Sequence, residues 1–426
     1  MKKEPILICL YAYYPFENAN TNVMLPLIDA LSKEYEVHIL TQNRNNSAPF
    51  DETTSDGIYV HRYKVHKKFV RWMHILAYAD CKKKRIWYKT VILRSLRLFS
   101  RCFSAIFPHS EYVRMKELMK RFSFAFVMST CVDFHSHRNM LKLKQKTGFQ
   151  TPWIAYFMDP FAYYISNRDN APELLALECQ VYEQADLVLV TDEIYRENQN
   201  NAFTPYLHKT IPYRFGNFRC LDNPLVRNIF IPGKINCVYV GSLLSEQIRS
   251  PRYLYQMINQ LDERFVFHII CNQVSEANWR VYQQLVQKKE NVRWYHNLPL
   301  AECLGIMSHA DILINLGNKS CNQTPSKIFD YIGTGKPIVN LFSLPNDTSK
   351  YYLENYPNKI NIYEDAGRLL ENVLLFSDFA VEHRGKIISK EQLLTLYSEY
   401  DSKEVTKETT KVIMDFVTGR RNKNAF

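Results

Sequence analysis

A lysine and an aspartate stand close together in the segment CNQTPSKIFDYIGTGKPIV, residues 321–339. Lys327 precedes Asp330 by three positions, in a stretch that predicts a short helix from Ser326 to Ile332. The first turn of a helix has unpaired N–H groups that attract anions, and a lysine there adds positive charge. A carboxylate one turn deeper can accept hydrogen bonds from hydroxyl groups. This order of groups suits a nucleoside diphosphate, with its phosphates at Ser326 and Lys327 and its ribose at Asp330.

The residues on either side of this segment support a helix start and exclude a P-loop. Thr324 can cap the helix, and Pro325 suits its first position. The Gly-Thr-Gly-Lys stretch at 333–336 is not a P-loop, because Lys336 precedes a proline and enters a strand instead of a helix. For this segment alone, an amphipathic helix with a solvated lysine and a surface aspartate is the alternative.

Short apolar runs alternate with helical patterns along the chain, as in parallel sheets whose strands are buried on both faces. The stretch 212–234, with its prolines and glycines, indicates a linker. We therefore expect two Rossmann-like α/β domains whose parallel sheets face an interdomain cleft, residues 1–215 and 230–395. A terminal helix in 396–426 would return to the first domain. Ligands of such sheets bind beyond the carboxyl ends of the strands. The expected strands are Ile6–Leu10, Glu36–Leu40, Gly57–Val65, Phe124–Ser129, Trp153–Phe157, Leu187–Val190, Asn236–Val240, Phe265–Ile270, Val292–Trp294, Ile312–Leu316 and Pro337–Leu341.

Length and composition indicate a compact protein that does not span a membrane. With 426 residues, 46% of them hydrophobic, the chain is long enough for two cores. Its ten cysteines are scattered without a CxxC pair, which favours buried reduced thiols. The N-terminal MKKEPILICL lacks a small-residue cleavage site, so we expect a first strand there and not a signal peptide. No apolar run approaches the ~20 residues that cross a bilayer.

The net charge of +11 is concentrated in one segment. Between Arg62 and Arg101, thirteen lysines and arginines accompany a single acid, Asp80, and large apolar residues are interleaved with them. Basic amphipathic segments bind anionic lipid surfaces. Residues 62–107 are therefore expected to form a membrane-facing insertion. A core helix with a solvated basic face and a nucleic-acid surface are the alternatives, but no nucleic-acid partner is expected because no other segment suggests such a module.

Several segments together resemble the GT-B-fold glycosyltransferases, especially the retaining glycosyltransferase family 4, also called glycosyltransferase group 1. PSKIFDYIGTGKPIV is similar to their donor-site helix and strand, and YVGSLLSEQIRSP to the first strand and loop of their C-terminal domain. NLPLAECLGIMSHADILINLG is similar to the base-contacting loop, helix and strand. ILICLYAYYP, STCVDFHSH and PWIAYFMDPF resemble strands of the N-terminal domain with their active-site loops. Each motif is weak alone, but together they cover most of the chain in the family's order.

This resemblance implies donor-binding roles in the C-terminal half. Lys327 and Arg249 would bind the diphosphate, and Asp330 the ribose. Gly241 would let the backbone approach the phosphates closely. Leu298 and Pro299 would border the base. The residues implied in donor binding are Gly241, Arg249, Leu298, Pro299, Ser326, Lys327 and Asp330.

The resemblance also implies three catalytic candidates: Asp159, His137 and Asn322. Asp159 matches the aspartate of an Asp-Pro-aromatic loop that faces the acceptor, with a turn-initiating Asp-Pro as the alternative. His137 matches the histidine after the fourth strand, with His135 as a competitor. Family members usually carry two glutamates eight positions apart, whereas this chain has Asn322 and Asp330. An amide can hydrogen-bond sugar hydroxyls, but it cannot stabilise a developing positive charge as a carboxylate does.

By this resemblance, the chain would transfer a sugar from a UDP- or GDP-sugar to a lipid-linked or polysaccharide acceptor in cell-surface glycan biosynthesis. The transfer would retain the configuration of the anomeric carbon. No permanently bound cofactor or metal is expected. Lys327 and Arg249 would stabilise the leaving diphosphate while the anomeric carbon passes through an oxocarbenium-like state. The protein would act in the cytoplasm, on the inner face of the cytoplasmic membrane. The alternatives are a nucleotide-sugar 2-epimerase of the same fold and an inactive nucleotide-sugar-binding relative, the latter suggested by Asn322.

Overall fold

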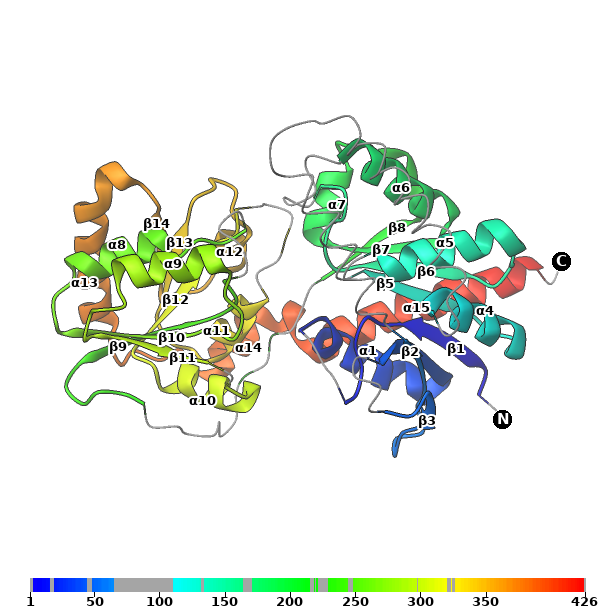
Figure 1. Ribbon diagram of the computed structural model, residues 1–426, viewed down its shortest axis with the longest axis horizontal. Coiled ribbons are helices and arrows are strands. Elements are labelled where there is room, and N and C mark those ends of the chain that lie inside the picture. Colours follow the sequence, from blue (N-terminus) through cyan, green and yellow to red (C-terminus); the bar gives the residue numbers. More distant parts are fainter. Residues whose placement is uncertain are drawn as a thin grey trace, which may run out of the picture.

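Two sheets organise the chain, one in each half (Figure 1). The computed structural model describes residues 3–15, 19–43, 48–64, 110–131, 134–163, 171–214, 218, 220, 229–243, 248–296, 298–319, 323 and 326–424. We call the part built on the first sheet the N-terminal unit and the part built on the second sheet the C-terminal unit.

The N-terminal unit contains an eight-stranded sheet of order β3-β4-β2-β1-β5-β6-β7-β8. All its strand pairs are parallel except β3 with β4. Its strands are β1 (Pro5–Cys9), β2 (Glu36–Asn43), β3 (Asp51–Thr53), β4 (Tyr59–Lys64), β5 (Val127–Cys131), β6 (Trp153–Phe157), β7 (Leu187–Thr191) and β8 (Thr210–Tyr213).

The C-terminal unit contains a six-stranded parallel sheet of order β11-β10-β9-β12-β13-β14. Its strands are β9 (Ile235–Val240), β10 (Phe265–Ile270), β11 (Val292–Tyr295), β12 (Ile312–Leu316), β13 (Ile338–Phe342) and β14 (Lys359–Tyr363).

The continuous apolar runs form strands because both faces of each sheet are covered. In β1, Ile6 and Ile8 belong to one hydrophobic cluster, whereas Leu7 and Cys9 belong to another, and all four are fully buried. Side chains alternate between the two faces of a strand, so the two clusters lie on opposite faces of the sheet. Helices supply the covering layers (Figure 1). They are α1 (Ala19–Glu34), α4 (Glu111–Arg121), α5 (His135–Thr147), α6 (Ala171–Gln184), α7 (Asp192–Asn198), α8 (Arg252–Gln260), α9 (Glu276–Leu285), α10 (Leu300–His309), α11 (Lys327–Gly333), α12 (Thr348–Tyr352), α13 (Leu369–His383), α14 (Lys390–Tyr397) and α15 (Ser402–Asn424), with 3₁₀ turns at Thr204–Lys209, Ala366–Arg368 and Ser398–Tyr400.

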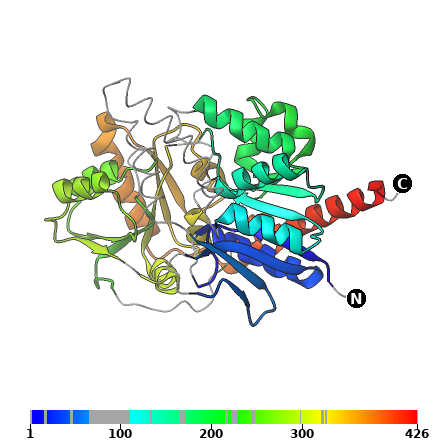
Figure 2. The same ribbon diagram turned by 45° about the vertical axis from the view of Figure 1, so that its right-hand side comes forward.

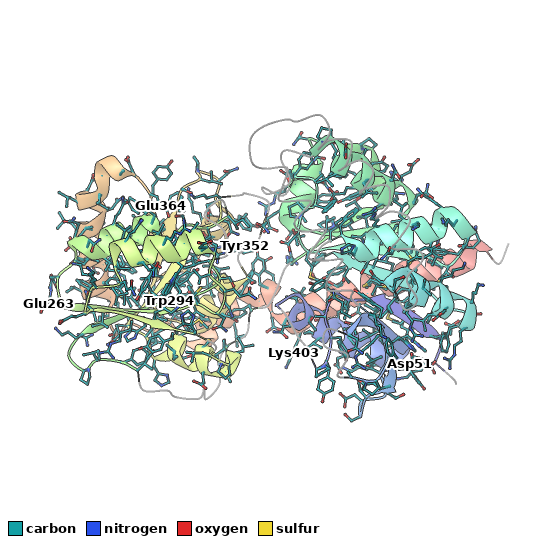
Figure 3. All side chains as sticks on the ribbon, in the orientation of Figure 1. Asp51, Glu263, Trp294, Tyr352, Glu364 and Lys403 are labelled. Atoms are coloured by element: carbon teal, nitrogen blue, oxygen red, sulfur yellow. The ribbon has the colours of Figure 1, made fainter. Side chains whose placement is uncertain are left out.

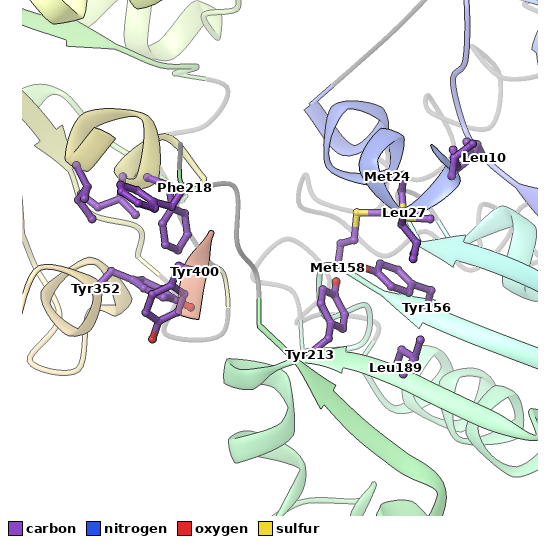
Figure 4. Close-up of a cluster of buried hydrophobic side chains, with 14 of the residues drawn as sticks. Leu10, Met24, Leu27, Tyr156, Met158, Leu189, Tyr213, Phe218, Tyr352 and Tyr400 are labelled. Carbon is purple, nitrogen blue, oxygen red and sulfur yellow. The ribbon is translucent and has the colours of Figure 1, made fainter. Parts of the chain in front are cut away.

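The last helix connects the two units. After α14, the chain turns at Ser398–Tyr400 and continues as α15, which runs along the N-terminal unit in both views (Figures 1 and 2) and contacts α1. Near this junction, Tyr352, Tyr400 and Phe218 gather on one side and Tyr156, Met158 and Tyr213 on the other (Figure 4). All six belong to one cluster of buried residues. Apolar packing therefore reaches into both units.

The expected α/β architecture with two parallel-dominated sheets is confirmed. Three expected strands, Trp153–Phe157, Phe265–Ile270 and Ile312–Leu316, have the observed bounds. Three further strands, β3, β8 and β14, were not expected from the sequence. The basic insertion expected at 62–107 lies outside the described residues except for 62–64. Among the described residues, no helix is long and apolar enough to cross a membrane.

Candidate active site

The strand order of the C-terminal sheet marks where a ligand can bind. Its β9 has β10 on one side and β12 on the other, so the chain changes direction across the sheet between β9 and β12. Open parallel sheets bind ligands at such a switch point, beyond the carboxyl ends of the strands. Gly241 directly follows β9, and Gly317 directly follows β12. These two glycines therefore lie at the expected ligand position.

The side chains of Tyr239 and Arg249 leave little room for a Cβ atom at Gly241. A Cβ atom at this position would lie 2.6 Å from Tyr239 Oη and 3.3 Å from Arg249 Nη1. Arg249 also donates from Nη2 to Asn318 Oδ1 at 2.7 Å. Since Asn318 follows β12, the guanidinium spans the ends of the two strands at the switch point. It is partly buried, with its Nε lacking a partner among the described residues. This geometry presents a fixed positive charge to an anion.

Helix α11 is held against the same strand end by Tyr331. The buried Tyr331 hydroxyl accepts from the Val240 N–H at 2.8 Å and donates to the Val240 carbonyl at 3.2 Å. The expected helix is thus present, shifted by one residue. Ser326 precedes it with helical φ and ψ and makes no side-chain cap. Thr324 and Pro325, the expected cap and first residue, lie outside the described residues.

We expect Tyr331→Phe to lower the free energy of unfolding by about 1–3 kcal/mol, because it leaves two buried backbone groups of Val240 without this partner. The change can be measured by urea unfolding. Tyr255→Phe is the matched control, because the Tyr255 hydroxyl is also buried but has no partner among the described residues. Equal losses in the two variants would contradict an anchoring role for Tyr331.

Lys327 and Asp330 contact each other directly. Lys327 Nζ donates to Asp330 Oδ2 at 2.8 Å, with the lysine side chain 32% exposed and the aspartate side chain 6% exposed. The lysine thus neutralises a buried carboxylate and still reaches the surface. An arriving phosphate can compete for its remaining N–H groups, since an ammonium has three donors. The pair is compatible with the predicted roles, but the sequence did not indicate that the two groups bind each other.

The two predicted base-binding residues precede α10 and differ in exposure. Leu298 is buried, and its carbonyl accepts from Asn272 Nδ2 at 3.4 Å. Pro299 is exposed and precedes α10. Burial raises the pKa of the nearby Cys303 thiol, while the charge of Lys327 opposes this shift.

Asp159 meets the C-terminal unit at the loop before α11. Gln323 Nε2 donates to Asp159 Oδ1 at 2.9 Å, and the Gln323 carbonyl accepts from Thr348 Oγ1 at 2.8 Å. Burial raises the pKa of the Asp159 carboxyl, and the hydrogen bond from Gln323 opposes this shift. A carboxylate that follows β6 of one sheet is therefore hydrogen-bonded to Gln323, which precedes Lys327 of the other unit by four positions in the sequence.

The loop that carries Asp159 is held by Glu178, a residue that sequence reasoning missed. Glu178 is only 2% exposed on α6, and its Oε2 accepts from the Ala162 N–H at 2.8 Å. The neighbouring Phe161 stacks on Phe134 with ring centroids 3.9 Å apart. The Asp159 loop is thus fixed from two sides. No local pattern distinguishes Glu178 from the other acids of α6, so only the tertiary contact identifies it.

The same burial makes Glu178 a pH-dependent element, since its pKa is raised from 4.5 to about 7. The folded state then binds this proton more tightly than the unfolded state, so ionisation between these pH values reduces stability. We expect the wild type to lose stability relative to Glu178→Gln as the pH rises from 4.5 to 7, measured by urea unfolding at a series of pH values. Glu173→Gln, at an exposed position of the same helix, should show no such trend. Parallel pH profiles for wild type and Glu178→Gln would contradict this assignment.

His137 lies inside the N-terminal unit. Its ring has 0% exposure, hydrogen-bonds through Nδ1 with Ser129 Oγ at 2.6 Å and stacks on Phe157. Burial lowers the pKa of His137 to about 3, so the imidazole is neutral. In this arrangement the ring is enclosed and does not contact the surface, whereas the competing His135 is exposed. Asn322, the third catalytic candidate, lies outside the described residues.

The structure thus brings Gly241, Arg249, Lys327 and Asp330 to one edge of the C-terminal sheet. It adds Asn318 and Gln323, which carry no recognisable motif and join the site only through tertiary contacts. Within the described ranges, no group of three or more His, Cys, Asp or Glu residues could hold a metal ion.

Two parallel-dominated sheets, each with a switch point, and a terminal helix that returns to the first unit define the GT-B fold. Solved structures with this fold cover almost the whole chain. Sucrose-phosphate synthase from Thermosynechococcus elongatus is similar over 98% of this chain and 100% of its own, with a TM-score of 0.71 and 11% identity. HepE from Anabaena, in complex with UDP and glucose, is similar over 97% of this chain and 100% of its own, with a TM-score of 0.60 and 10% identity. The lipopolysaccharide outer core galactosyltransferase WaaB is similar over 96% of this chain and 99% of its own, with a TM-score of 0.57 and 13% identity. No family model and no curated protein matches the chain.

Proposed function

We propose that this chain is a glycosyltransferase of the retaining family 4 type, which moves a sugar from a UDP- or GDP-sugar to a lipid-linked or polysaccharide acceptor. One observation carries the proposal. Asp159 of the N-terminal unit is hydrogen-bonded to Gln323, four residues before the Lys327–Asp330 pair of the C-terminal unit. A carboxylate of the N-terminal unit is therefore connected through one hydrogen bond to the segment that leads to the charged pair of the C-terminal unit. That arrangement suits group transfer between two bound substrates.

In the proposed reaction, Arg249 and Lys327 bind the diphosphate. Their charges, held in place by Asn318 and Asp330, stabilise the leaving group as the glycosidic bond breaks. Asp330 accepts from the ribose hydroxyls once Lys327 has turned to the phosphate. Asp159 accepts from the acceptor hydroxyl, and Asn322 hydrogen-bonds the donor sugar. A catalytic role for His137 stays a prediction; its enclosed, neutral ring would first have to become accessible.

The comparisons support the donor class. The structure of HepE contains UDP and glucose, and a second structure of HepE contains UDP-glucose. Another similar structure is a complex of MnaA from S. aureus with UDP. These ligands belong to those proteins, and they make UDP and UDP-glucose the first probes for this chain.

The test is release of free nucleoside diphosphate from a panel of UDP- and GDP-sugars, with and without membrane extract. Release that requires both a donor and the extract supports transfer to an acceptor. Interconversion of the sugar without release would instead support a 2-epimerase, and binding with neither reaction would support an inactive relative. The Asp159→Asn variant distinguishes the first outcome from hydrolysis by contaminating enzymes, because contaminants would be unaffected.

The basic segment 62–107 suggests that the protein binds its acceptor at a membrane surface. We propose that it holds the protein on an anionic membrane, at the inner face of the cytoplasmic membrane, where a lipid-linked acceptor would lie. Liposomes with acidic phospholipid should therefore retain the protein in a flotation assay at low salt. Replacement of Lys82, Lys83, Lys84 and Arg85 by glutamate should release it. Unchanged flotation of this variant, or equal retention on neutral liposomes, would refute the membrane role.

A further inference from the structure

Two buried histidines face each other in the sheet of the N-terminal unit, and the proposed function uses neither of them. His38 of β2 is 0% exposed and His61 of β4 is 4% exposed, and His38 Nδ1 lies 2.9 Å from His61 Nε2. Their rings are almost parallel, with centroids 5.2 Å apart. Tyr59 stacks on His38, and the centroid of the Phe122 ring lies 4.4 Å from that of His38. The histidine pair is therefore enclosed by other rings.

Each histidine has a carboxylate at its second ring nitrogen. His38 Nε2 lies 3.0 Å from Glu36 Oε1, and His61 Nδ1 lies 2.6 Å from Asp51 Oδ1. The side chains of Glu36 and Asp51 are 24% and 49% exposed. Asp51 lies in the N-terminal unit, away from Tyr352 at the junction (Figure 3). We call the series Glu36, His38, His61 and Asp51 the histidine chain. Its middle is buried and both of its ends reach solvent, so protons can enter it.

The number of contacts fixes the number of protons that the histidine chain needs. Three hydrogen bonds connect its four groups, and each requires one proton between its two atoms. Two neutral imidazoles carry two ring protons, and an ionised carboxylate carries none. The complete chain therefore needs one additional proton. Imidazole is more basic than a carboxylate, so this proton belongs to the histidine pair.

A second additional proton does not fit the same geometry. If His38 and His61 were both imidazolium rings, each of their four ring nitrogens would carry a proton. Two N–H groups would then point at each other across the 2.9 Å that separates His38 Nδ1 from His61 Nε2. Two positive charges would also be buried side by side. The closed arrangement therefore accommodates one shared proton at most.

Charges from α4 also act on the histidine chain. Arg114 donates to Asp51 Oδ1, and the charge of Arg121 acts on His38. Desolvation would raise the pKa of Asp51, but hydrogen bonds from His61 and Arg114 lower it, so that this carboxyl is ionised near neutral pH. The two arginines disfavour further positive charge on the histidines. They thus add to the reasons why the pair does not bind two protons.

The direction of the pH effect follows from proton binding in the closed and opened states. Burial lowers the pKa of both imidazoles from 6.5, and the carboxylates Glu36 and Asp51 oppose the shift. In a locally opened state both histidines would regain the ordinary value and bind two protons as the pH falls through it. The closed state binds one at most. The state that binds more protons gains population as the pH falls, so acid favours the opened state.

The histidine chain joins elements that border the basic segment in the sequence. Strand β4 ends at Lys64, and α4 begins at Glu111. His61 belongs to β4, and Arg114 of α4 hydrogen-bonds the Asp51 end of the chain. Both elements also contact β2, which carries His38. Opening of the histidine chain would therefore loosen β4 and α4 together.

We propose that the histidine chain is a proton-operated switch, which holds one shared proton at most when closed and releases β3, β4 and α4 from β2 when the histidines bind a second. The proposal concerns the N-terminal unit alone. It assigns a role to four residues that lie outside the candidate active site, and local opening of this kind occurs in folded proteins without global unfolding.

The first test counts protons in the full-length wild type. Nitrogen NMR on protein with isotope-labelled histidine reports which ring nitrogens of His38 and His61 carry a proton, from about pH 7.5 to about pH 4.5. The single variants His38→Gln and His61→Gln assign the signals. We expect three of the four ring nitrogens to be protonated in the acidic folded protein. Four would mean two independent imidazolium rings and two would mean a pair that stays neutral, and either result overturns the shared proton.

The second test measures opening by hydrogen exchange of the β3, β4 and α4 amides. Protection in wild type should fall about tenfold for each pH unit below 6.5, because the opened state binds one proton more than the closed state. The double variant His38→Gln/His61→Gln cannot bind these protons and should show no such fall. His208→Gln, at an exposed position, is the matched control and should behave as the wild type.

Protection that does not change with pH in the wild type, or that falls equally in the double variant, overturns the coupling between proton binding and opening. The proton count and the pH profile of the wild type decide the matter without the double variant if that variant does not fold. Neither test uses a nucleotide or an acceptor, so its outcome is independent of the proposed function.

Discussion

Lys327→Ala should lower kcat/KM for the nucleotide sugar by about 10²–10³-fold, the effect of removing one preorganised donor from a developing anion. The affinity for free UDP or GDP should fall about tenfold, because one charge-assisted hydrogen bond to the diphosphate is lost. The kinetic loss exceeds the loss in binding because negative charge grows on the diphosphate as the glycosidic bond breaks. Nucleoside diphosphate release and calorimetry measure the two effects.

The structure predicts that Lys327→Ala also lowers the free energy of unfolding. Lys327 also pairs with Asp330, whose side chain is 6% exposed. Removing the lysine leaves that carboxylate without this charged partner, which should cost about 1–3 kcal/mol of unfolding free energy. Lys327→Ala/Asp330→Asn removes both charges and should recover part of the stability, but not the diphosphate affinity.

Lys386→Ala is the matched control for Lys327→Ala. Lys386 has a side chain 51% exposed and pairs with Glu382 on the surface. Its replacement should change neither nucleotide affinity nor turnover. Near-normal nucleotide binding by Lys327→Ala, with Lys386→Ala also normal, would mean that the diphosphate lies elsewhere.

Asp159→Asn should lower kcat by about 10²-fold or more while leaving nucleotide affinity close to that of the wild type. The amide oxygen of asparagine can still accept from Gln323, so the contact between the units should persist. The lost charge affects only the acceptor hydroxyl, which approaches in the reacting complex. A large loss of kcat with an unchanged dissociation constant for UDP or GDP is the expected result.

Asp378→Asn is the matched control, because it makes the same replacement at an exposed position of α13. It should retain full turnover. If Asp159→Asn loses nucleotide affinity and turnover in equal measure, Asp159 supports the donor site through Gln323 and has no separate role toward the acceptor.

Much of this architecture can be predicted because each strand carries its signal locally. Phe265–Ile270 and Ile312–Leu316 are short runs that are apolar except for His268 and Asn315, and such runs become strands when helices cover both sheet faces. The strand β14 (Lys359–Tyr363) was missed because it lies at the edge of the sheet and only Ile362 of its five residues is buried. The edge strand β3, with its sequence Asp-Glu-Thr, carries no apolar signal at all.

The residues of the candidate site also fall into two groups, those that the sequence indicates and those that it does not. Lys327, Asp330 and Gly241 were predicted because a helix start and a strand end are visible in the sequence itself, and their roles stay predictions. Glu178, Asn318 and Gln323 were not found, because each acts on a residue that is distant in sequence or has no motif of its own. The catalytic role of His137 stays a prediction: its sequence position suggests that role, and the structure adds that its ring is enclosed by aromatic side chains.

The sequence by itself determined the alternation of strands and helices and the concentration of positive charge in 62–107. It also determined that Gly241 ends a strand and that Lys327 stands at the start of a helix. Each of these depends on residue type and short-range spacing. Only the tertiary structure decided that Lys327 pairs with Asp330, that Asp159 reaches Gln323, and that His38 and His61 face each other. Those contacts involve strands, loops and helices of both units, and their geometry exists only after the two sheets have packed.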